Sequence, residues 1–528
     1  MKVKYIDYNE TRCFSSTVIR YLDEDKQIAP FINQFPDLTA FKSIIKDRNF
    51  KGNRVTLVEV LNHQYKNIQH QPETLKKNIT SLKSTQTFTV TTGHQLNIFT
   101  GPLYFIFKIV STINLAKDLK KDFPEHDFVS IYWMATEDHD FEEINHTYLA
   151  GKKIEWKKET QGATGRINPK SILQALNEYK SILGVSANAD KLSKIITQAY
   201  TEFDTLADST RFLVNELFGE IGLVILDADD KLLKKQFSTI VQEDIVSQKS
   251  FGNINLSSAD LAKIDIHAQV NPREINFFYL LDDLRERIVH ENKKYQVLNT
   301  EISFSEEELK LEITSNPERF SPNVVMRPLY QEVILPNIAY VGGGGELAYW
   351  LQLKSNFDFY KVDFPLLILR NSALLADENI ERKLHKINLN FEDIFEETST
   401  LQKSWIEKHS SHQLNIQQEW EQLSLIFEGL KTRVSKIDLT LNASTEAVKT
   451  RLKKALDNLE KKLIRAEKRN FEEAIEAIEK IRNILFPGGG LQERKENFGL
   501  FYVKYGDDFI AELIESFHPL DFKFTILY

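Results

Sequence analysis

Short apolar runs alternate with helical patterns over the first 370 residues of the chain. Five runs have the length and composition of buried strands, at residues 88–90, 129–134, 223–226, 338–341 and 366–369. Between the first two, residues 103–119 repeat apolar side chains at helical spacing. This order predicts a βαβ unit with a parallel strand pair, so we expect a layered α/β body.

The pattern changes after residue 373. Up to residue 486 the chain lacks proline, and apolar residues recur at steps of three and four through 420–441 and again through 448–466. Two long helices paired as an antiparallel hairpin are expected, with a turn near 438–442 and an exposed seam suited to dimerisation. The apolar run at 522–527 is expected to return to the main sheet as an edge strand.

These patterns divide the chain into three parts. We expect a catalytic core at 1–373 with insertions at roughly 150–210 and 235–325, a helical coiled-coil arm at 374–486, and a segment at 487–528 that returns to the core. A chain of 528 residues is too long for one hydrophobic core, because cores stop growing near about 250–300 residues.

Composition excludes several classes of protein. The 42% apolar and 27% charged residues are typical of a packed soluble protein, and a net charge of -9 opposes attraction to nucleic acid or anionic lipid. The single cysteine, Cys13, excludes an intrachain disulfide and a multi-cysteine zinc site. Without an apolar leader or a long uninterrupted apolar segment, a cytoplasmic location is expected, with no membrane and no nucleic-acid partner.

A polar loop follows the first strand-like run. Gly93 allows a tight turn, and His94 and Gln95 present hydrogen-bonding groups. Thr100 and Pro102 fit a helix N-cap and an early helical proline, and a helix N-terminus attracts phosphate or carboxylate. Two interpretations stay open: the loop binds such an anion, or Thr100 only caps the helix and His94 satisfies a buried carbonyl.

A second polar loop follows the run at 129–134. Its chemistry-bearing side chains are Glu137, Asp138, His139, Asp140, Glu142, Glu143, Asn145 and His146. Such groups hold divalent ions, act as general bases or bind ammonium groups, although an acidic cluster also simply favours a helix start. No HExxH motif is present, so a substrate-binding or acid-base role is favoured over a protein-only metal site.

A glycine-rich loop follows the run at 338–341. It reads Tyr340-Val341-Gly342-Gly343-Gly344-Gly345-Glu346, which lets a ligand approach the backbone. The loop matches neither GxGxxG nor a P-loop, which disfavours a nicotinamide cofactor or a Walker-type ATPase. Arg327 and Arg370 add positive charge nearby, although a surface salt bridge explains either one equally well. Because ligands bind beyond the carboxyl ends of strands in open α/β sheets, the loops are expected to share one pocket, and an enzyme is the leading hypothesis.

Together these motifs resemble the bacillithiol biosynthesis cysteine-adding enzymes, the BshC family. The resemblance covers essentially the whole chain and lies in residues 92–95, 99–104, 136–143, 327–331, 335–343 and 491–494, with Asn497 after the helical arm. It implies a Rossmann-like core similar to class I aminoacyl-tRNA synthetases and nucleotidyltransferases, with connecting insertions and a coiled-coil dimerisation arm.

The resemblance also implies a reaction. A ligase of this family joins the carboxyl group of L-cysteine to the amine of glucosaminyl-malate, giving bacillithiol. Amide formation from a free carboxylate is uphill, so we expect activation by ATP, most simply as cysteinyl-adenylate, with Mg²⁺ as a companion ion. No zinc, flavin or NAD is expected. A homodimer formed through the arm is expected.

Within that scheme the chain offers three sets of site residues. The expected catalytic residues are His94, Gln95, Asp138, His139 and Asn145. The expected substrate-binding residues are Gly93, Thr100, Glu137, Arg327, Tyr340, Gly342, Gly343 and Glu346, and the expected nucleotide-binding residues are Gln492, Arg494 and Asn497. A lysine-rich KMSK-type loop is absent. Two other hypotheses stay open: a scaffold with an anion-binding core, and a metal-dependent hydrolase built on residues 137–146.

Overall fold

The computed structural model describes all 528 residues, and the chain divides into two units. The first contains residues 1–9, 13–374 and 490–527, and the second contains residues 10–12, 375–489 and 528. The first unit therefore combines the N-terminal part of the chain with residues 490–527 near its C-terminus, while the second is made mostly from one continuous segment.

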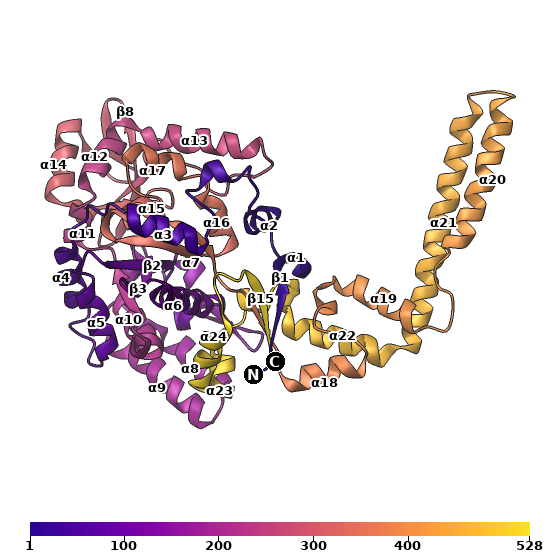
Figure 1. Cartoon of the computed structure of the whole chain (residues 1–528), viewed down its shortest axis with the longest axis horizontal. Helices are drawn as coiled ribbons and strands as arrows, with labels where there is room; N and C mark the ends of the chain where they lie inside the picture. Colours follow the sequence, from indigo (N-terminus) through magenta and orange to yellow (C-terminus); the bar gives the residue numbers. More distant parts are fainter. The chain divides into compact units, whose positions relative to one another are not determined.

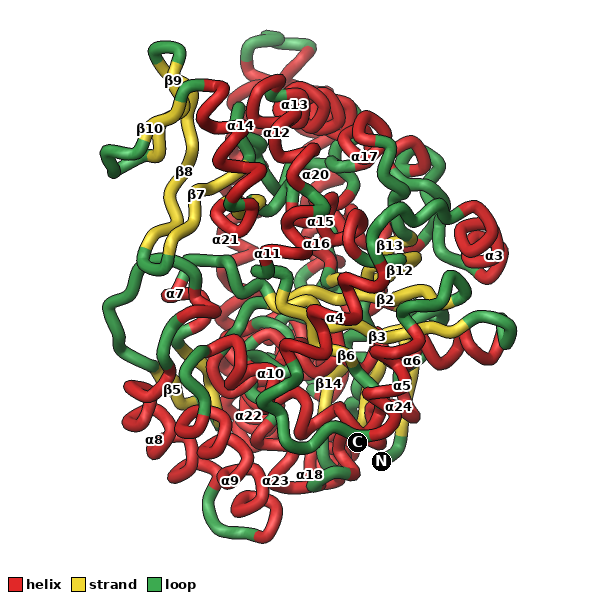
Figure 2. The backbone as a smooth tube through the Cα atoms, turned by 90° about the vertical axis from the view of Figure 1, so that its left-hand side faces the viewer, coloured by secondary structure: helices red, strands yellow, loops and turns green.

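Five parallel strands form the central sheet of the first unit. Their order across the sheet is β13-β12-β2-β3-β6, with bounds β2 (Thr87–His94), β3 (Asp127–Met134), β6 (Val224–Asp227), β12 (Asn337–Gly342) and β13 (Leu366–Leu369). All five apolar runs found in the sequence lie in this sheet (Figure 2). Strand order reverses between β2 and β12, which leaves a crevice at their carboxyl ends, as in Rossmann-like folds.

The strands read as continuous apolar runs because helices cover the sheet. Helix α6 (Tyr104–Asp122) connects β2 to β3 and packs with α3 (Leu38–Asp47) on a core that includes Phe41, Leu119 and Ile338. A parallel sheet buried on both faces needs apolar side chains on both. The Rossmann-like core and the βαβ unit expected from the sequence are therefore confirmed.

Helix α6 begins later than its sequence suggests. The expected N-cap, Thr100, has a φ of +69° and lies in a left-handed stretch with Phe99 and Gly101. The helix starts at Tyr104, and its N-cap residue is Leu103. The prediction that Thr100 caps this helix is wrong, because the loop backbone turns away before the helix begins.

Further sheets and helices surround the central sheet. Strands β7 (Phe277–Leu281), β8 (Leu284–Glu291), β9 (Lys294–Val297), β10 (Ser303–Phe304) and β11 (Phe320–Pro322) form an antiparallel sheet, and β4 (His146–Leu149) pairs with β5 (Lys152–Glu155). The other helices outside the arm are α1 (Tyr8–Thr11), α2 (Ser16–Leu22), α4 (Arg54–Gln64), α5 (Glu73–Ser81), α7 (Phe141–Ile144), α8 (Leu173–Leu183), α9 (Ala187–Glu202), α10 (Leu206–Phe218), α11 (Lys231–Lys235), α12 (Ser238–Ser247), α13 (Lys249–Ala262), α14 (Glu306–Ser315), α15 (Arg327–Ile334), α16 (Gly344–Trp350), α17 (Lys354–Tyr360), α23 (Gly499–Tyr505) and α24 (Asp508–Ser516).

The last strand does not join the main sheet. Strand β15 (Lys523–Leu527) lies between β1 (Val3–Asp7) and β14 (Ala373–Leu375) in a separate three-stranded sheet. The expected return to the main sheet is wrong, because the first strand of the chain supplies the pairing edge. Residues 490–527 nevertheless belong to the same unit as the central sheet.

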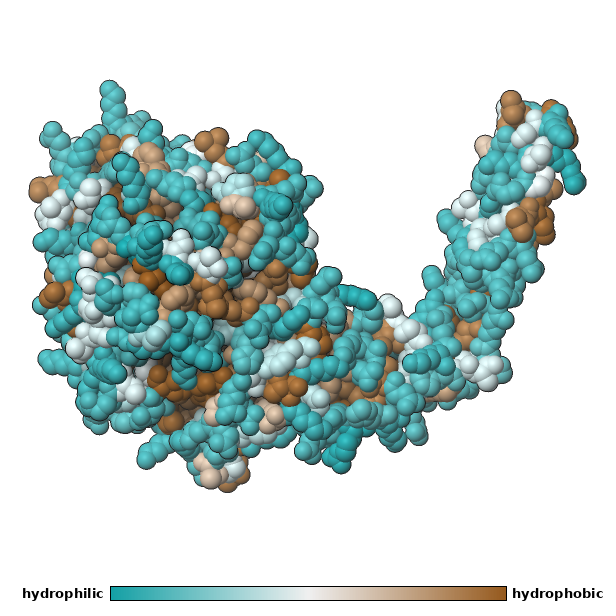
Figure 3. Space-filling view, in the orientation of Figure 1, coloured by the Kyte–Doolittle hydropathy of each residue, from teal (hydrophilic) through white to brown (hydrophobic).

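The second unit is helical. It contains α18 (Glu378–Lys386), α19 (Thr398–His409), α20 (Gln417–Ser435), α21 (Leu441–Asn470) and α22 (Glu472–Leu485). Helices α20 and α21 form the expected antiparallel hairpin (Figure 1), joined by ion pairs such as Lys431–Glu446 at 2.8 Å. No residue of α20 is buried, and brown patches mark the exposed apolar side chains of the hairpin in Figure 3. None of the helices is long and apolar enough to cross a membrane.

Candidate active site

A cavity of about 870 Å³ opens at the carboxyl ends of β2, β3 and β12. Its walls come from the loops after those strands, from the β7–β8 hairpin and from the C-terminal segment. This is the crevice where the strand order reverses, which is where open α/β sheets bind ligands. Its charged or ionisable lining residues are His94, Tyr104, Lys108, Glu137, Asp138, Arg273, Arg285, Arg287, Arg327, Tyr340, Glu346, Tyr349, Arg370 and Arg494.

The loops after β2 and β12 are locked together by a buried lysine. The Lys108 ammonium on α6 donates to the carbonyl of Gly93 at 2.9 Å and pairs with Glu346. Glu346 also accepts from the Tyr340 hydroxyl at 2.6 Å and the Gly343 amide at 2.9 Å. Burial tends to raise the pKa of Glu346, but Lys108 and these donors outweigh it and hold the pKa below its usual value. Glu346 is therefore an ionised positioning group.

His94 presents an uncharged imidazole to the cavity. Its ring packs against Tyr104 and Phe105, with centroids 5.3 and 5.1 Å away. Its Nε2 atom is shielded from solvent and has no hydrogen-bond partner. Burial, followed by the positive charges of Lys108 and Arg370, lowers the pKa of His94 well below its usual value. The unpaired nitrogen is free to bond a ligand atom.

Two arginines, the half-buried Arg327 and the buried Arg370, line the cavity close to the Gly93–His94 segment. Arg327 lies 5.7 Å from the ring centroid of Trp133 and donates to Tyr349 at 3.4 Å. Arg370 donates to Glu493 at 2.6 Å, and its buried Nε has no partner. An unpaired guanidinium nitrogen beside an uncharged imidazole suits an anionic ligand such as phosphate or carboxylate.

The cavity as a whole is electropositive, although the chain is acidic. Its cationic side chains are Lys108, Arg273, Arg285, Arg287, Arg327, Arg370 and Arg494, whereas its carboxylates are Glu137, Asp138 and Glu346. That gives seven cations against three carboxylates, in a chain of net charge -9. The field therefore concentrates anions at this one place.

Asp138 is held as a carboxylate. It accepts hydrogen bonds from the Gln95 side chain at 2.7 Å and from the amide of His139 at 2.8 Å. Burial tends to raise the pKa of Asp138, but interactions with the His139 and Gln95 side chains, the charge of Arg285 and the Asp140 amide lower it far below its usual value. A permanent carboxylate in the cavity wall suits a cationic group of a ligand.

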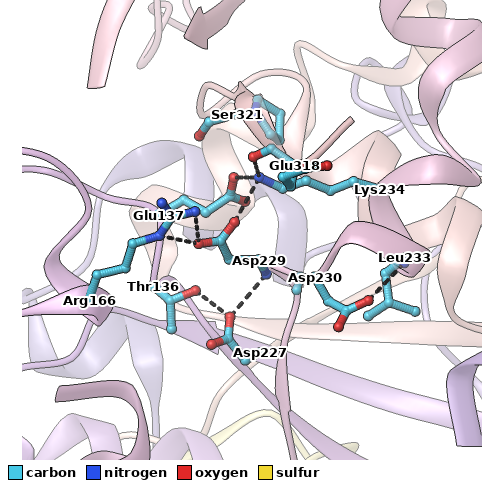
Figure 4. A network of polar contacts seen from close by, with 12 residues as sticks. Thr136, Glu137, Arg166, Asp227, Asp229, Asp230, Leu233, Lys234, Glu318 and Ser321 are labelled. Atoms are coloured by element: carbon cyan, nitrogen blue, oxygen red, sulfur yellow. Dashed lines mark hydrogen bonds and ion pairs between the residues drawn. The ribbon is translucent and has the colours of Figure 1, made fainter. Parts of the chain in front are cut away.

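The neighbouring Glu137 belongs to the charged network drawn in Figure 4. Its carboxylate lies 2.5 Å from the buried ammonium of Lys234, which also contacts Asp229 at 2.9 Å. Asp229 in turn pairs with Arg166 at 2.8 Å. Burial, with Asp229 close by, raises the pKa of Glu137 despite Lys234. Glu137 and Asp138, which are neighbours in the loop after β3, therefore differ in proton affinity.

Several expected site residues lie elsewhere. His139 and Asp140 line a second cavity of about 950 Å³, where His139 contacts Arg285 at 2.8 Å. Asn145 does not line the main cavity, and its side chain bonds His146 at 3.0 Å. Gly342 ends β12 without lining the cavity. The polar loop after β3 is thus shared between two cavities.

The C-terminal residues expected to bind nucleotide do not all line the main cavity. Arg494 lines the cavity, whereas Gln492 and Asn497 are buried outside it. Asn497 donates to the carbonyls of Phe99 and Gly101 at 2.8 and 2.7 Å. These contacts hold the left-handed loop that contains the buried Thr100, so the Asn497 amide is already used within the protein.

Sequence patterns alone missed several cavity or network residues, among them Lys108, Lys234 and Arg285. Lys108 offers one available signal, because it sits in a helix with apolar residues on every side. A lysine there is buried and needs a partner. Lys234 and Arg285 lie in short, polar elements that give no such signal. No three His, Cys, Asp or Glu side chains come together as a metal-binding group.

Comparison with known proteins agrees with this architecture. Residues 1–371 match the family model described as "Bacillithiol biosynthesis BshC, N-terminal Rossmann-like domain", and residues 373–528 match "Bacillithiol biosynthesis BshC, C-terminal coiled-coil domain". A structure titled as an arginyl-tRNA synthetase from Campylobacter jejuni covers 88% of this chain and 98% of its own, at 10% identity. Its TM-score of 0.23 is too low to support any argument about fold or function.

Relatives match along their whole length. Proteins named "Putative cysteine ligase BshC" are 46% identical in Flavobacterium psychrophilum, over 100% of this chain and 99% of the relative, and 43% identical in Flavobacterium johnsoniae, over 100% of both. One of the same name in Bacillus cytotoxicus is 29% identical over 94% of this chain and 95% of the relative. With two family models spanning the chain, this protein belongs to the BshC family of bacillithiol biosynthesis.

Proposed function

We propose that this chain is a cytoplasmic ligase that joins the carboxyl group of L-cysteine to the amine of glucosaminyl-malate. The observation that carries the proposal is the electropositive cavity at the strand-order reversal, with buried unpaired nitrogens on His94 and Arg370 and with the carboxylates of Glu137 and Asp138 in the loop after β3. Family membership supports L-cysteine as one substrate, because the relatives are named as cysteine ligases, and glucosaminyl-malate is the acceptor that the resemblance to this family implies.

The cationic end fits the phosphates of ATP. His94 Nε2 and Arg370 Nε are buried and unpaired, and Arg494 lines the same cavity. ATP would supply the activation of the cysteine carboxyl group, with Mg²⁺ as a companion ion. The residues' own part is electrostatic, because fixed donors in a partly closed cavity stabilise developing negative charge without reorganising.

The acidic end fits an amino group. Asp138 stays ionised because Gln95 and the backbone donate to it. An ammonium group placed there is attracted by Asp138, and a carboxylate of the same substrate is attracted by Arg285 beside it or by Lys108 and Arg370 across the cavity. Such a pattern of charges orients a substrate that carries both an amine and a carboxylate.

The test is product formation by the purified chain. Incubation with L-cysteine and glucosaminyl-malate, with and without ATP and Mg²⁺, is followed by mass spectrometry. We expect bacillithiol only with ATP, and its loss in Asp138→Asn and His94→Ala proteins whose thermal unfolding is unchanged. Unchanged product in both variants would place the catalytic residues elsewhere, absence of product from the wild-type chain would favour a scaffold role, and product formed without any nucleotide would contradict the activation step.

We also propose a homodimer formed through the arm. Leu425, Ile426 and Ile437 of the α20–α21 hairpin are 74%, 59% and 76% exposed. Two helices alone leave this seam uncovered, and a second copy of the hairpin would bury it.

A further inference from the structure

We propose that Glu137 accepts the proton of the substrate amine, and that Lys234 is the positioning residue that holds Glu137 at the cavity wall. This inference rests on the proposed ligase function, because the proton comes from the amine that the ligase acylates. The sequence placed Glu137 in a loop with a favoured substrate-binding or acid-base role without singling it out as a proton acceptor, and it gave no role to Lys234.

Glu137 lines the cavity and also belongs to the buried charge cluster that Figure 4 shows. Its side chain keeps 13% of its surface exposed and lines the cavity, whereas that of Lys234 is 3% exposed. The Lys234 ammonium contacts Glu137, Asp229 and the carbonyl of Glu318 at 2.5, 2.9 and 3.0 Å. Lys234 contacts one Glu137 oxygen, Oε1, and the other has no bonded donor, so it is available to a ligand.

The other bases of the cavity are unsuited to this task. Glu346 is saturated by Lys108, Tyr340 and Gly343. Asp138 accepts from several donors, which lower its pKa and make it a weak base. His94 is flanked by Lys108 and Arg370, whose charges repel an ammonium group.

The charged and titratable surroundings of Glu137 come from five elements. The facing groups are Lys234 from α11, Asp229 after β6, Arg166 from the turn at 164–166, Arg285 from β8 and Tyr330 from α15. Burial and the Asp229 carboxylate raise the pKa of Glu137, while Lys234 and Arg285 act against them. The resulting proton affinity is higher than that of an exposed glutamate, which suits a general base near neutral pH.

The substrate nitrogen loses two protons in the proposed step. A substrate ammonium gives one proton to the Glu137 carboxylate, and the neutral nitrogen then attacks the activated carbonyl carbon of cysteine. The new carbon–nitrogen bond forms as the bond from that carbon to the phosphate oxygen breaks. The second nitrogen proton leaves with the departing phosphate, and Glu137 returns its proton to solvent.

The Glu137→Gln variant distinguishes proton transfer from the amine from the earlier activation of the cysteine carboxyl group. Hydroxylamine is uncharged at neutral pH and needs no base, so it traps activated cysteine as a hydroxamate. We expect the variant to keep ATP-dependent hydroxamate formation within about threefold and to lose amide formation with glucosaminyl-malate by about 100-fold or more. Glu125→Gln, which changes an exposed glutamate that lines neither the main nor the second cavity, is the matched control with wild-type rates in both assays.

Lys234→Met tests the positioning role. Removing the ammonium raises the pKa of Glu137, so the acid limb of amide formation should move to higher pH while hydroxamate formation persists. A merely structural loss would lower the rate equally at every pH. Lys231→Met, which changes an exposed lysine in the same helix, should leave the profile unchanged.

Three results would overturn the inference. Amide formation by Glu137→Gln within about threefold of wild type would remove the proton-acceptor role. Parallel loss of hydroxamate and amide would assign Glu137 to activation or folding instead. Absence of both products from the wild-type chain would overturn the proposed ligase function itself, and this inference with it.

Discussion

Removing Arg48 should destabilise the first unit in a pH-dependent way. Arg48 and Glu332 form a buried ion pair at 3.0 Å, with side chains 1% and 0% exposed. Glu332 also accepts from Gln331 at 2.9 Å and Asn337 at 2.7 Å. Burial raises the pKa of Glu332 to about 7, although Arg48 acts against the rise. The charge of this glutamate therefore changes in the neutral range.

The direction of the raised pKa of Glu332 determines how the stability of the protein changes with pH. A raised carboxyl pKa contributes stability that is fully present below the unfolded value of 4.5 and is lost as the pH rises through about 7. The difference between the folded and unfolded pKa values of Glu332 corresponds to about 3 kcal/mol of stability, at about 1.4 kcal/mol per pH unit. Without Arg48 the pKa of Glu332 rises further, so the loss at alkaline pH becomes larger.

The expected cost of Arg48→Met differs at two pH values. At pH 8.5 a buried carboxylate loses its cation, which costs about 3–5 kcal/mol. At pH 5.5 Glu332 is protonated, and the remaining cost is that of unpaired groups such as the Leu335 carbonyl, about 1–3 kcal/mol.

The assay is urea unfolding followed by tryptophan fluorescence at both pH values. Lys191→Met, which removes an exposed pair with Asp507, is the control and should change the free energy of unfolding by less than about 0.5 kcal/mol. An equal loss at both pH values, or a loss below about 1 kcal/mol at pH 8.5, would refute the reasoning.

Three further changes have expected outcomes. Asn497→Ala removes the hydrogen bonds that the Asn497 amide donates to the carbonyls of the 99–101 loop, so the free energy of unfolding should fall by about 2–4 kcal/mol. Hydrogen exchange of the amides in this loop should rise, and unchanged exchange would contradict the prediction. Gly344→Ala places a Cβ 2.7 Å from Val18 and should lower Tm, whereas Gly345→Ala meets nothing within 4 Å and should not; equal Tm values would be inconsistent with the packing. Leu425→Glu should shift sedimentation from dimer to monomer, and an unchanged dimer would place the interface elsewhere.

The central sheet could be predicted because its strands are buried on both faces. Val90, Ile131 and Ile338 belong to runs that are mostly apolar, interrupted only by small buried residues such as Thr89 and Ser130, and such runs can be recognised in a single sequence. The arm was legible for a similar reason, since its apolar residues repeat at coiled-coil spacing. Local patterns of this kind need no knowledge of distant partners.

The features that could not be predicted depend on contacts between residues that are far apart in the sequence. Thr100 matches a helix cap locally, but Asn497 binds the backbone on either side of it and the helix starts later. The 522–527 run is a strand, yet its partner β1 lies at the opposite end of the chain. Asp138 and His139 are adjacent, but they line different cavities. Each outcome depends on tertiary packing that spacing does not encode.

The most direct measurement is a crystal structure with a non-hydrolysable sulfamoyl analogue of cysteinyl-adenylate. We predict that the analogue occupies the cavity between β2 and β12, with its sulfamoyl group near His94 and Arg370 and its amino group near Asp138. Density for the analogue outside this cavity, or within it but with the amino group at the Arg370 end, would contradict the proposed catalytic site.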